Sequence, residues 1–231
     1  MDDKGRLFII STPIGNLKDI TLRALDVLNS VSVLACEDTR HTKKLLAHYR
    51  ISVPEVFAYH QHNESSAINR ILTRLSEGKD VGLVCDAGTP GISDAGYLIV
   101  KEARKNGYNV LSVPGPSALC SAVSVSGLPS SYVLFIGFLP RKKSRKKKLL
   151  QAYESIKTLG GTIVLYEAPH RVEKLVSEIE EVFGPNVECA LIKELTKQHE
   201  TAFSGPVSLI KENLSKNFVQ GEFVVCIYVE K

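Results

Sequence analysis

Short apolar runs alternate with amphipathic stretches along almost the whole chain. Nine runs are rich in aliphatic and β-branched residues, and most are separated by segments whose apolar residues recur every three or four positions. The runs cover residues 7–10, 32–36, 56–58, 81–85, 110–113, 132–136, 162–166, 187–192 and 222–229. This alternation predicts an α/β fold with mostly parallel sheets that helices cover on both faces.

The chain is long enough for two lobes. Nine strands are many for one sheet in 231 residues, so we expect two sheets, each with its own helices. Pro114-Gly115-Pro116 is the sharpest break between two apolar runs. It predicts an N-terminal α/β lobe over residues 1–115 and a C-terminal α/β lobe over residues 116–231.

The apolar run 81–85 leads straight into a loop of small residues. Asp86 comes next, and the glycines of residues 85–96 would let a ligand approach the backbone. A helix is expected to start at Ser93 or Asp94, because both residue types favour helix N-caps. An acid and glycines after a buried strand are typical of the ligand crevice of α/β proteins, but an ordinary strand-to-helix loop can also contain them.

A second loop of this kind follows the run 110–113. Residues 114–116 end the run, and Ser117 is expected to cap a helix of small residues that begins at Ala118. Small side chains would leave room for a ligand against the backbone, and they would equally suit tight packing of a helix on a sheet. The sequence leaves both interpretations open.

Several classes of protein are disfavoured by the sequence. The chain has neither G-x-G-x-x-G nor G-x-x-x-x-G-K-[ST], which argues against dinucleotide and nucleoside triphosphate chemistry. Its five cysteines stand singly, and His60 with His62 does not make a metal site, so we expect buried thiols and no metal. No apolar run is long enough to span a bilayer and no signal-peptide core is visible, so we expect a cytoplasmic protein.

Positive charge is concentrated in one short run. Seven of the eight residues from Arg141 to Lys148 are basic, and since the net charge is +4, the rest of the chain carries −3. A compact basic run is a footprint for a polyanion such as RNA, although lysine-rich runs are also common on solvated helix faces. The residues expected to contact RNA phosphates are Arg141, Lys142, Lys143, Arg145, Lys146, Lys147 and Lys148.

Six short motifs between residues 12 and 171 occur together in one known family. Besides residues 85–96, they are Thr12-Pro13-Ile14-Gly15-Asn16, Glu37-Asp38-Thr39-Arg40, Tyr59-His60-Gln61-His62-Asn63-Glu64, Phe138-Leu139-Pro140-Arg141-Lys142 and Tyr166-Glu167-Ala168-Pro169-His170-Arg171. In this order the chain resembles the tetrapyrrole methylase superfamily of S-adenosylmethionine-dependent methyltransferases, and within it the ribosomal RNA small subunit methyltransferase I family. Gly91 and Ala95 depart from the family pattern, which has a bulky apolar residue and a proline there.

The resemblance implies an enzyme of two α/β/α lobes with S-adenosylmethionine between them. It would methylate the 2′-hydroxyl of a cytidine in the decoding region of 16S rRNA, within the 30S ribosomal subunit, and it would be a homodimer. By match to the family motifs, the cofactor is expected to contact Pro13, Asp86, Ala87, Gly88, Thr89, Ile92, Ser117, Ala118, Tyr166 and Glu167.

Methyl transfer to a ribose hydroxyl needs an aligned donor and acceptor, and it gains from a general base or a cation near the oxygen. Asp38, Arg40 and Glu167 are the catalytic candidates, although Asp38 and Arg40 could merely cap a helix that starts near Thr39. His170 and Arg171 are expected to face RNA or simply solvent. Other groups that the sequence cannot rank are Glu37, His60, Glu64, Lys193 and Glu194.

Two further functions remain open at the level of sequence. The first is methylation of a porphyrin or corrin precursor, which shares the fold and the cofactor. The absence of a glycine-rich first loop and the presence of the lysine run argue against it. The second is a non-enzymatic RNA-binding protein on the same fold, which the intact crevice motifs oppose.

Overall fold

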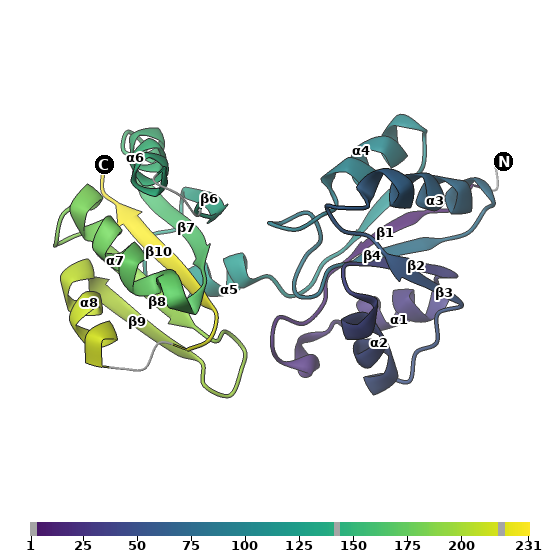
Figure 1. The fold of residues 1–231 in the computed structure, drawn as a ribbon, viewed down its shortest axis with the longest axis horizontal. Helices are drawn as coiled ribbons and strands as arrows, with labels where there is room; N and C mark the ends of the chain where they lie inside the picture. The colour runs from purple at the N-terminus through teal and green to yellow at the C-terminus, as the bar shows by residue number, and fades with distance from the viewer. Residues whose placement is uncertain (1–3, 141–143, 217–219) are drawn as a thin grey trace. The chain divides into compact units, whose positions relative to one another are not determined.

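The computed structural model describes residues 4–140, 144–216 and 220–231. The chain divides into two compact units after Ser117, and each unit has its own five-stranded sheet with flanking helices (Figure 1). The α/β fold with two sheets is therefore confirmed. The lobe boundary predicted from the sequence lies two residues earlier, after residue 115.

The sheet of the first unit is entirely parallel, with the order β3-β2-β4-β1-β5. Its strands are β1 (Leu7–Ile10), β2 (Val33–Cys36), β3 (Glu55–Ala58), β4 (Val81–Val84) and β5 (Val110–Val113). Its helices are the 3₁₀ turn η1 (Leu17–Asp19), α1 (Leu22–Ser30), α2 (Thr39–His48), α3 (Glu64–Ser76) and α4 (Tyr97–Lys105).

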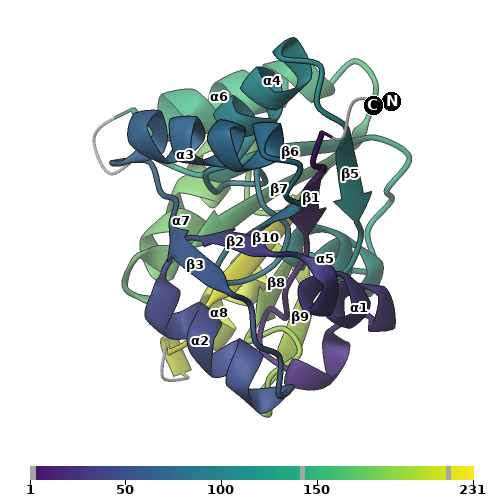
Figure 2. The same cartoon turned by 90° about the vertical axis from the view of Figure 1, so that its right-hand side faces the viewer.

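The helices of the first unit cover both faces of its sheet (Figure 2). Ala24 and Leu28 of α1 share one core cluster with Leu46 of α2, whereas Ile71 of α3 shares the other with Ile99 of α4. Crossovers between parallel strands are right-handed, so the direction in which the chain steps across the sheet decides the face that each helix covers. The chain steps from β1 toward β3 through α1 and α2, and then back from β3 toward β5 through α3 and α4.

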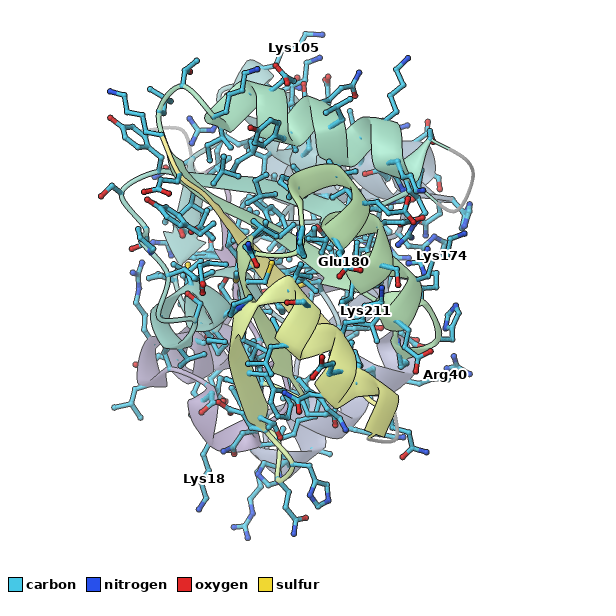
Figure 3. All side chains as sticks on the ribbon, turned by 90° about the vertical axis from the view of Figure 1, so that its left-hand side faces the viewer. Lys18, Arg40, Lys105, Lys174, Glu180 and Lys211 are labelled. Atoms are coloured by element: carbon cyan, nitrogen blue, oxygen red, sulfur yellow. The ribbon has the colours of Figure 1, made fainter. Side chains whose placement is uncertain are left out.

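The sheet of the second unit is mixed, with the order β6-β7-β10-β8-β9. Its strands are β6 (Val133–Phe138), β7 (Gly161–Glu167), β8 (Glu188–Lys193), β9 (Thr201–Pro206) and β10 (Phe223–Val229), and its helices are α5 (Ala118–Val125), α6 (Arg145–Ile156), α7 (Pro169–Phe183) and α8 (Val207–Lys216). The helices α6, α7 and α8 pack on one face of this sheet around Leu149, Leu175 and Ile210. An ion pair of 2.5 Å between Glu180 of α7 and Lys211 of α8 joins two of them (Figure 3).

The second sheet departs from the parallel pairing that the alternation predicted. Only β6 and β7 pair in parallel, and the other three pairings are antiparallel. Parallel neighbours need a crossover of a dozen or more residues, whereas residues 194–200 alone separate β8 from β9. The sequence prediction missed β9, because it is an edge strand that ends in Gly205 and Pro206, both typical of turns.

Within the described parts of the chain, every helix is too short or too polar to cross a membrane.

Candidate functional site

The carboxyl ends of β1 and β4 lie where the direction of the chain across the first sheet reverses. These strands are neighbours in the sheet, but the chain leaves them for helices on opposite faces. Such a topological switch point is where open α/β sheets bind their ligands. The loops that follow the two strands, residues 11–16 and 85–96, contain two of the motifs found in the sequence.

The loops after β1 and β4 are bound to each other. The Thr12 N–H donates to the Gly88 carbonyl at 2.8 Å, and the Gly88 N–H donates to the Thr12 carbonyl at 3.0 Å. The Thr12 hydroxyl donates to the Cys85 carbonyl at 3.1 Å. Gly88 has a φ of +84°, which suits glycine, and a Cβ there would stand 3.4 Å from Ile14. The two loops are therefore held together through their backbones.

The loop after β5 joins the same group. The Thr89 hydroxyl donates to the Pro116 carbonyl at 3.2 Å, and the Ser11 and Thr89 hydroxyls lie 2.8 Å apart. A Cβ on Gly115 would stand 3.0 Å from the Cβ of Ser11, so a larger residue would push the loops apart. The structure thus brings together three strand-end loops that the sequence could examine only singly.

The residues expected to contact the cofactor are not equally accessible within these loops. Pro13 and Gly88 are buried, whereas Ala87 and Ile92 are exposed. Ser117 ends the first unit, and Ala118 is the first residue of α5, as the sequence predicted.

Four carboxylates gather at the carboxyl ends of β2 and β4. The Asp38 N–H donates to Asp86 Oδ1 at 3.1 Å, and the Asp86 N–H donates to Glu37 Oε2 at 3.4 Å. Asp94 is near enough to Glu37 and Asp86 for both to raise its pKa by repulsion. Asp38 is paired with Arg40, so the other three acids would attract a cationic ligand to the edge of the sheet.

Asp94 does not start a helix, so that prediction is wrong. The helix α4 begins at Tyr97, and Ser93 has a left-handed φ of 66° that interrupts any earlier helical turn. The carboxylate instead lies near the Cys85 thiol, which donates to the Ala87 carbonyl at 3.3 Å. Burial, together with repulsion from Glu37, raises the pKa of Asp94 to about 6. A nearby cation would favour the charged form of this group.

Asp38 and Arg40 form a helix cap and an ion pair. Asp38 Oδ1 accepts from the Arg40 N–H at 2.7 Å and so caps α2, and Asp38 Oδ2 accepts from Arg40 Nη2 at 2.7 Å. The Arg40 side chain holds the pKa of Asp38 well below its usual range. Both Asp38 oxygens are engaged, which opposes a role as a base. The Arg40 side chain is 87% exposed.

The loop after β3 holds another candidate base. The Asn63 side chain fixes this loop by accepting from the His60 N–H at 2.8 Å and donating to the Ala58 carbonyl at 2.8 Å. Glu64 accepts from the Tyr59 hydroxyl at 2.9 Å, so its carboxylate is engaged. The His60 Nδ1 atom is buried without a hydrogen-bond partner among the described residues.

In the second unit, Glu167 at the end of β7 is the centre of a buried ion network. Its Oε2 accepts from Arg145 Nη2 at 2.7 Å, and its Oε1 accepts from the Ala168 N–H at 2.9 Å and from Arg171 Nη2 at 2.6 Å. Arg145 Nε also donates to Glu178 Oε2 at 2.8 Å. The Glu167 side chain has no exposed surface. Both of its oxygens are engaged in this network, which opposes a role as a general base.

Arg145 is not part of the exposed basic run, contrary to the prediction. It is 4% exposed, because its guanidinium is enclosed between Glu167 and Glu178. Lys146 pairs with Glu181, and Lys147 and Lys148 are exposed on the first turn of α6. The other residues of the predicted basic run, Arg141, Lys142 and Lys143, lie outside the described residues. Of the two residues predicted on α7, His170 is exposed and Arg171 is half-buried.

An aromatic group at the ends of β6 and β7 was not singled out from the sequence. The rings of Phe135 and Phe138 lie 5.0 and 5.5 Å from the ring of Tyr166, both edge to face. Phe138 is 56% exposed although it is a large apolar side chain. A bulge between Phe135 and Gly137 brings both rings to the Tyr166 side, which a strict alternation of strand residues does not predict.

The described residues contain no cluster of three or more His, Cys, Asp or Glu side chains that could hold a metal ion. Four of the cysteines are buried, as expected, but Cys120 on α5 is exposed.

Comparison with known proteins agrees with the loops and the topology. Residues 6–210 match the family model of the tetrapyrrole (corrin/porphyrin) methylases. Among solved structures, a cobalt precorrin-4 methyltransferase has a TM-score of 0.69 at 18% identity and covers 96% of this chain and 94% of its own. A diphthine synthase has a TM-score of 0.72 at 15% identity, with 97% and 90% covered. These likenesses define the fold as that of a tetrapyrrole methylase.

Curated relatives are much closer in sequence. Proteins named ribosomal RNA small subunit methyltransferase I are 43% identical in Xylella fastidiosa, over 98% of this chain and 82% of that protein, and 44% identical in Thermotoga maritima, over 96% and 98%. The protein of that name in Bacillus subtilis is 43% identical, over 99% of this chain and 76% of its own. The chain belongs to the ribosomal RNA small subunit methyltransferase I family of the tetrapyrrole methylases.

Proposed function

We propose that this protein uses S-adenosylmethionine to methylate the 2′-hydroxyl of a cytidine ribose in the decoding region of 16S rRNA. The observation that carries the proposal is the group of three bonded strand-end loops beside four carboxylates, found in a chain whose relatives are named rRNA methyltransferases. Methylation of a porphyrin or corrin precursor is less well supported, since the tetrapyrrole enzymes are distant relatives that share the fold alone.

The first unit suits a ligand that carries positive charge. S-adenosylmethionine has a sulfonium and an ammonium group, and when bound it supplies an activated methyl group to the acceptor oxygen. Asp86 and Asp94 would receive these cations, and the raised pKa of Asp94 is the kind of perturbation that a cationic ligand relieves. The loop backbone at Pro13, Gly88 and Thr89 would hold the neutral parts of the cofactor.

We also propose that Tyr166 contacts the cofactor through its ring, as the family motifs imply, and that the carboxylate of Glu167 does not contact it. Tyr166 is half-buried and packs edge to face against Phe135 and Phe138. An aromatic ring gives an adenine a surface to pack on.

The acceptor must approach the edge of the first sheet. Arg40 presents an exposed guanidinium there, held by its pairing with Asp38, and it would contact the RNA beside the acceptor ribose. In this proposal Asp38 is a positioning residue for Arg40. The geometry of its carboxylate does not support proton abstraction.

RNA binding would be shared with the second unit, where the side chains of Lys147 and Lys148 are exposed on α6. We further propose that the protein meets its rRNA within the 30S subunit, in the cytoplasm, and that it acts as a homodimer. The names of the relatives, which refer to methylation of ribosomal RNA, support the RNA substrate.

One assay tests the proposal. The protein is incubated with S-adenosylmethionine labelled in the methyl group and is offered 30S subunits, naked 16S rRNA and a tetrapyrrole precursor in parallel. Label should enter one of the two RNA substrates, at a cytidine and in an alkali-resistant 2′-O-methyl linkage. Label on the tetrapyrrole, on a base, or on no substrate would overturn the proposed function.

A further inference from the structure

Arg145 at the start of α6 and Arg171 at the start of α7 have more donors than the surrounding described residues accept. Arg145 uses Nε and Nη2 on Glu178 and Glu167, and Arg171 uses Nη2 on Glu167. Arg145 Nη1, Arg171 Nε and Arg171 Nη1 are buried and have no hydrogen-bond partner among the described residues. Buried polar groups in proteins are nearly always hydrogen-bonded, so donors in this number point to an acceptor that the described residues do not supply.

These donors lie beside the beginning of a long helix. The helix α7 runs from Pro169 to Phe183, and its N-cap residue, Ala168, has no side-chain acceptor for the first turn. The N-terminus of a helix carries partial positive charge and favours anions. Arg145, which is nine-tenths buried, reaches the same point through Glu167, the residue just before the N-cap. The helix end and the unpartnered guanidinium groups therefore favour the same kind of ligand.

The charge around this point is positive. Glu167 and Glu178 balance Arg145 and Arg171, and the exposed Glu173 balances the exposed Lys174, which leaves Lys147 and Lys148 as further exposed basic groups on α6. The Arg171 side chain is 20% exposed, so the residue reaches solvent, whereas its Nε and Nη1 atoms are themselves buried. Arg145 lies deeper and acts through Glu167, whose two oxygens join the two guanidinium groups.

We propose that the start of α7 binds one backbone phosphate of the RNA substrate, with Arg171 as the contact residue and Arg145 and Glu167 as positioning residues. A phosphate offers several charged acceptor oxygens, which match the planar donors of a guanidinium. The site fixes the position of the strand and reads no base. This inference rests on the proposed function, because it takes RNA as the substrate.

The first test is Arg171→Lys, which keeps a cation for Glu167 but removes Nε and Nη1. Binding of a short single-stranded RNA should weaken about tenfold, because an ammonium group lacks the planar donors that match a phosphate, and the slope of log affinity against log salt should stay close to that of the wild type, because the charge is kept. Lys174→Gln is the matched control on the same helix: its side chain is 72% exposed, and removing a whole charge there should change affinity less than Arg171→Lys does. Wild-type affinity in Arg171→Lys would overturn the proposal.

A second measurement uses the wild-type protein and so does not depend on how well a variant folds. The Arg171 Nε–H resonance, assigned by its absence from Arg171→Lys, is followed by NMR during titration with the RNA and, separately, with inorganic phosphate. It should shift with micromolar RNA and only with far higher inorganic phosphate. No shift with RNA, or a shift with phosphate alone, would overturn the site. Cofactor binding, measured by calorimetry, should stay unchanged in Arg171→Lys, so failure of this site and failure of the methyltransferase assignment are distinguishable.

Discussion

Replacing Asp94 by Asn should stabilise the first unit above pH 6. Burial and the neighbouring Glu37 raise the pKa of this carboxyl from 3.8 to about 6. The folded state therefore binds the proton more tightly than the unfolded state, and the charged form destabilises the fold. This cost is nearly absent below pH 3.8, grows between pH 3.8 and pH 6, and is complete above pH 6. Asn resembles the protonated acid and removes the cost at every pH.

The magnitude follows from the two pKa values. The difference between 3.8 and about 6 corresponds to roughly 3 kcal/mol for a fully shielded group. Asp94 is only partly buried, so solvent screening reduces the expected gain to about 1–2 kcal/mol at pH 7.5. At pH 4 the variant and the wild type should differ by a few tenths of a kcal/mol.

The assay must report on the first unit, because the chain has two. Both proteins are equilibrated in urea at several pH values between 4 and 8, pulse-labelled with deuterium at one fixed pH, and analysed by the labelling of peptides that contain β4 (Val81–Val84). Asp26→Asn, at an exposed position on α1, controls for the change of net charge. A stability difference between Asp94→Asn and wild type that is constant over this pH range would refute the reasoning.

Three further predictions concern the proposed activity. Asp86→Asn should weaken S-adenosylmethionine binding by about 1–3 kcal/mol, because the carboxylate would accept charged hydrogen bonds. If calorimetry gives the variant the affinity of the wild type, Asp86 is not part of the site. Changing Lys147 and Lys148 together to Gln should lower the slope of log RNA affinity against log salt by about 1.4, or 0.7 for each phosphate that is no longer neutralised. The modified nucleotide should stay the same. An unaltered slope would mean that the two lysines only face solvent. Asp38→Ala should cost about 1 kcal/mol of stability, because α2 loses its cap. It should also reduce methylation more than cofactor binding, because Arg40 loses its partner. Methylation equal to that of the wild type in a turnover assay would mean that Asp38 serves only as a helix cap.

The parts of the fold that depend on local pattern could be predicted from the sequence. Leu7–Ile10 and Val110–Val113 are strands with the predicted bounds, and the helix at Ala118 starts where Ser117 indicated. The loops after β1, β4 and β5 were singled out for their small residues, and the structure shows them bonded to one another. Their meeting required the strand order, which places β1 between β4 and β5 and which no local pattern contains.

The sequence predictions that failed concern residues whose environment is set by residues far away in the sequence or by the fold of a loop. Arg145 stands among lysines and was expected on the surface, but Glu167 and Glu178, 22 and 33 residues away, hold it inside. Asp94 has the residue type of a helix cap, but the left-handed φ of Ser93 interrupts any helical turn there, and this conformation depends on the fold of the loop. Of the catalytic candidates, only Arg40 presents an exposed polar group, and its position too depends on its pairing.

The buried ion network of the second unit restricts how this region can vary. Removing one member leaves an uncompensated buried charge, which typically costs about 3–5 kcal/mol, while replacing a whole buried set by well-packed apolar residues can be neutral. Substitutions at Arg145, Glu167, Arg171 and Glu178 should therefore be tolerated jointly and rejected singly. In a library that randomises these four positions, stably folded clones should carry either all four charges or none.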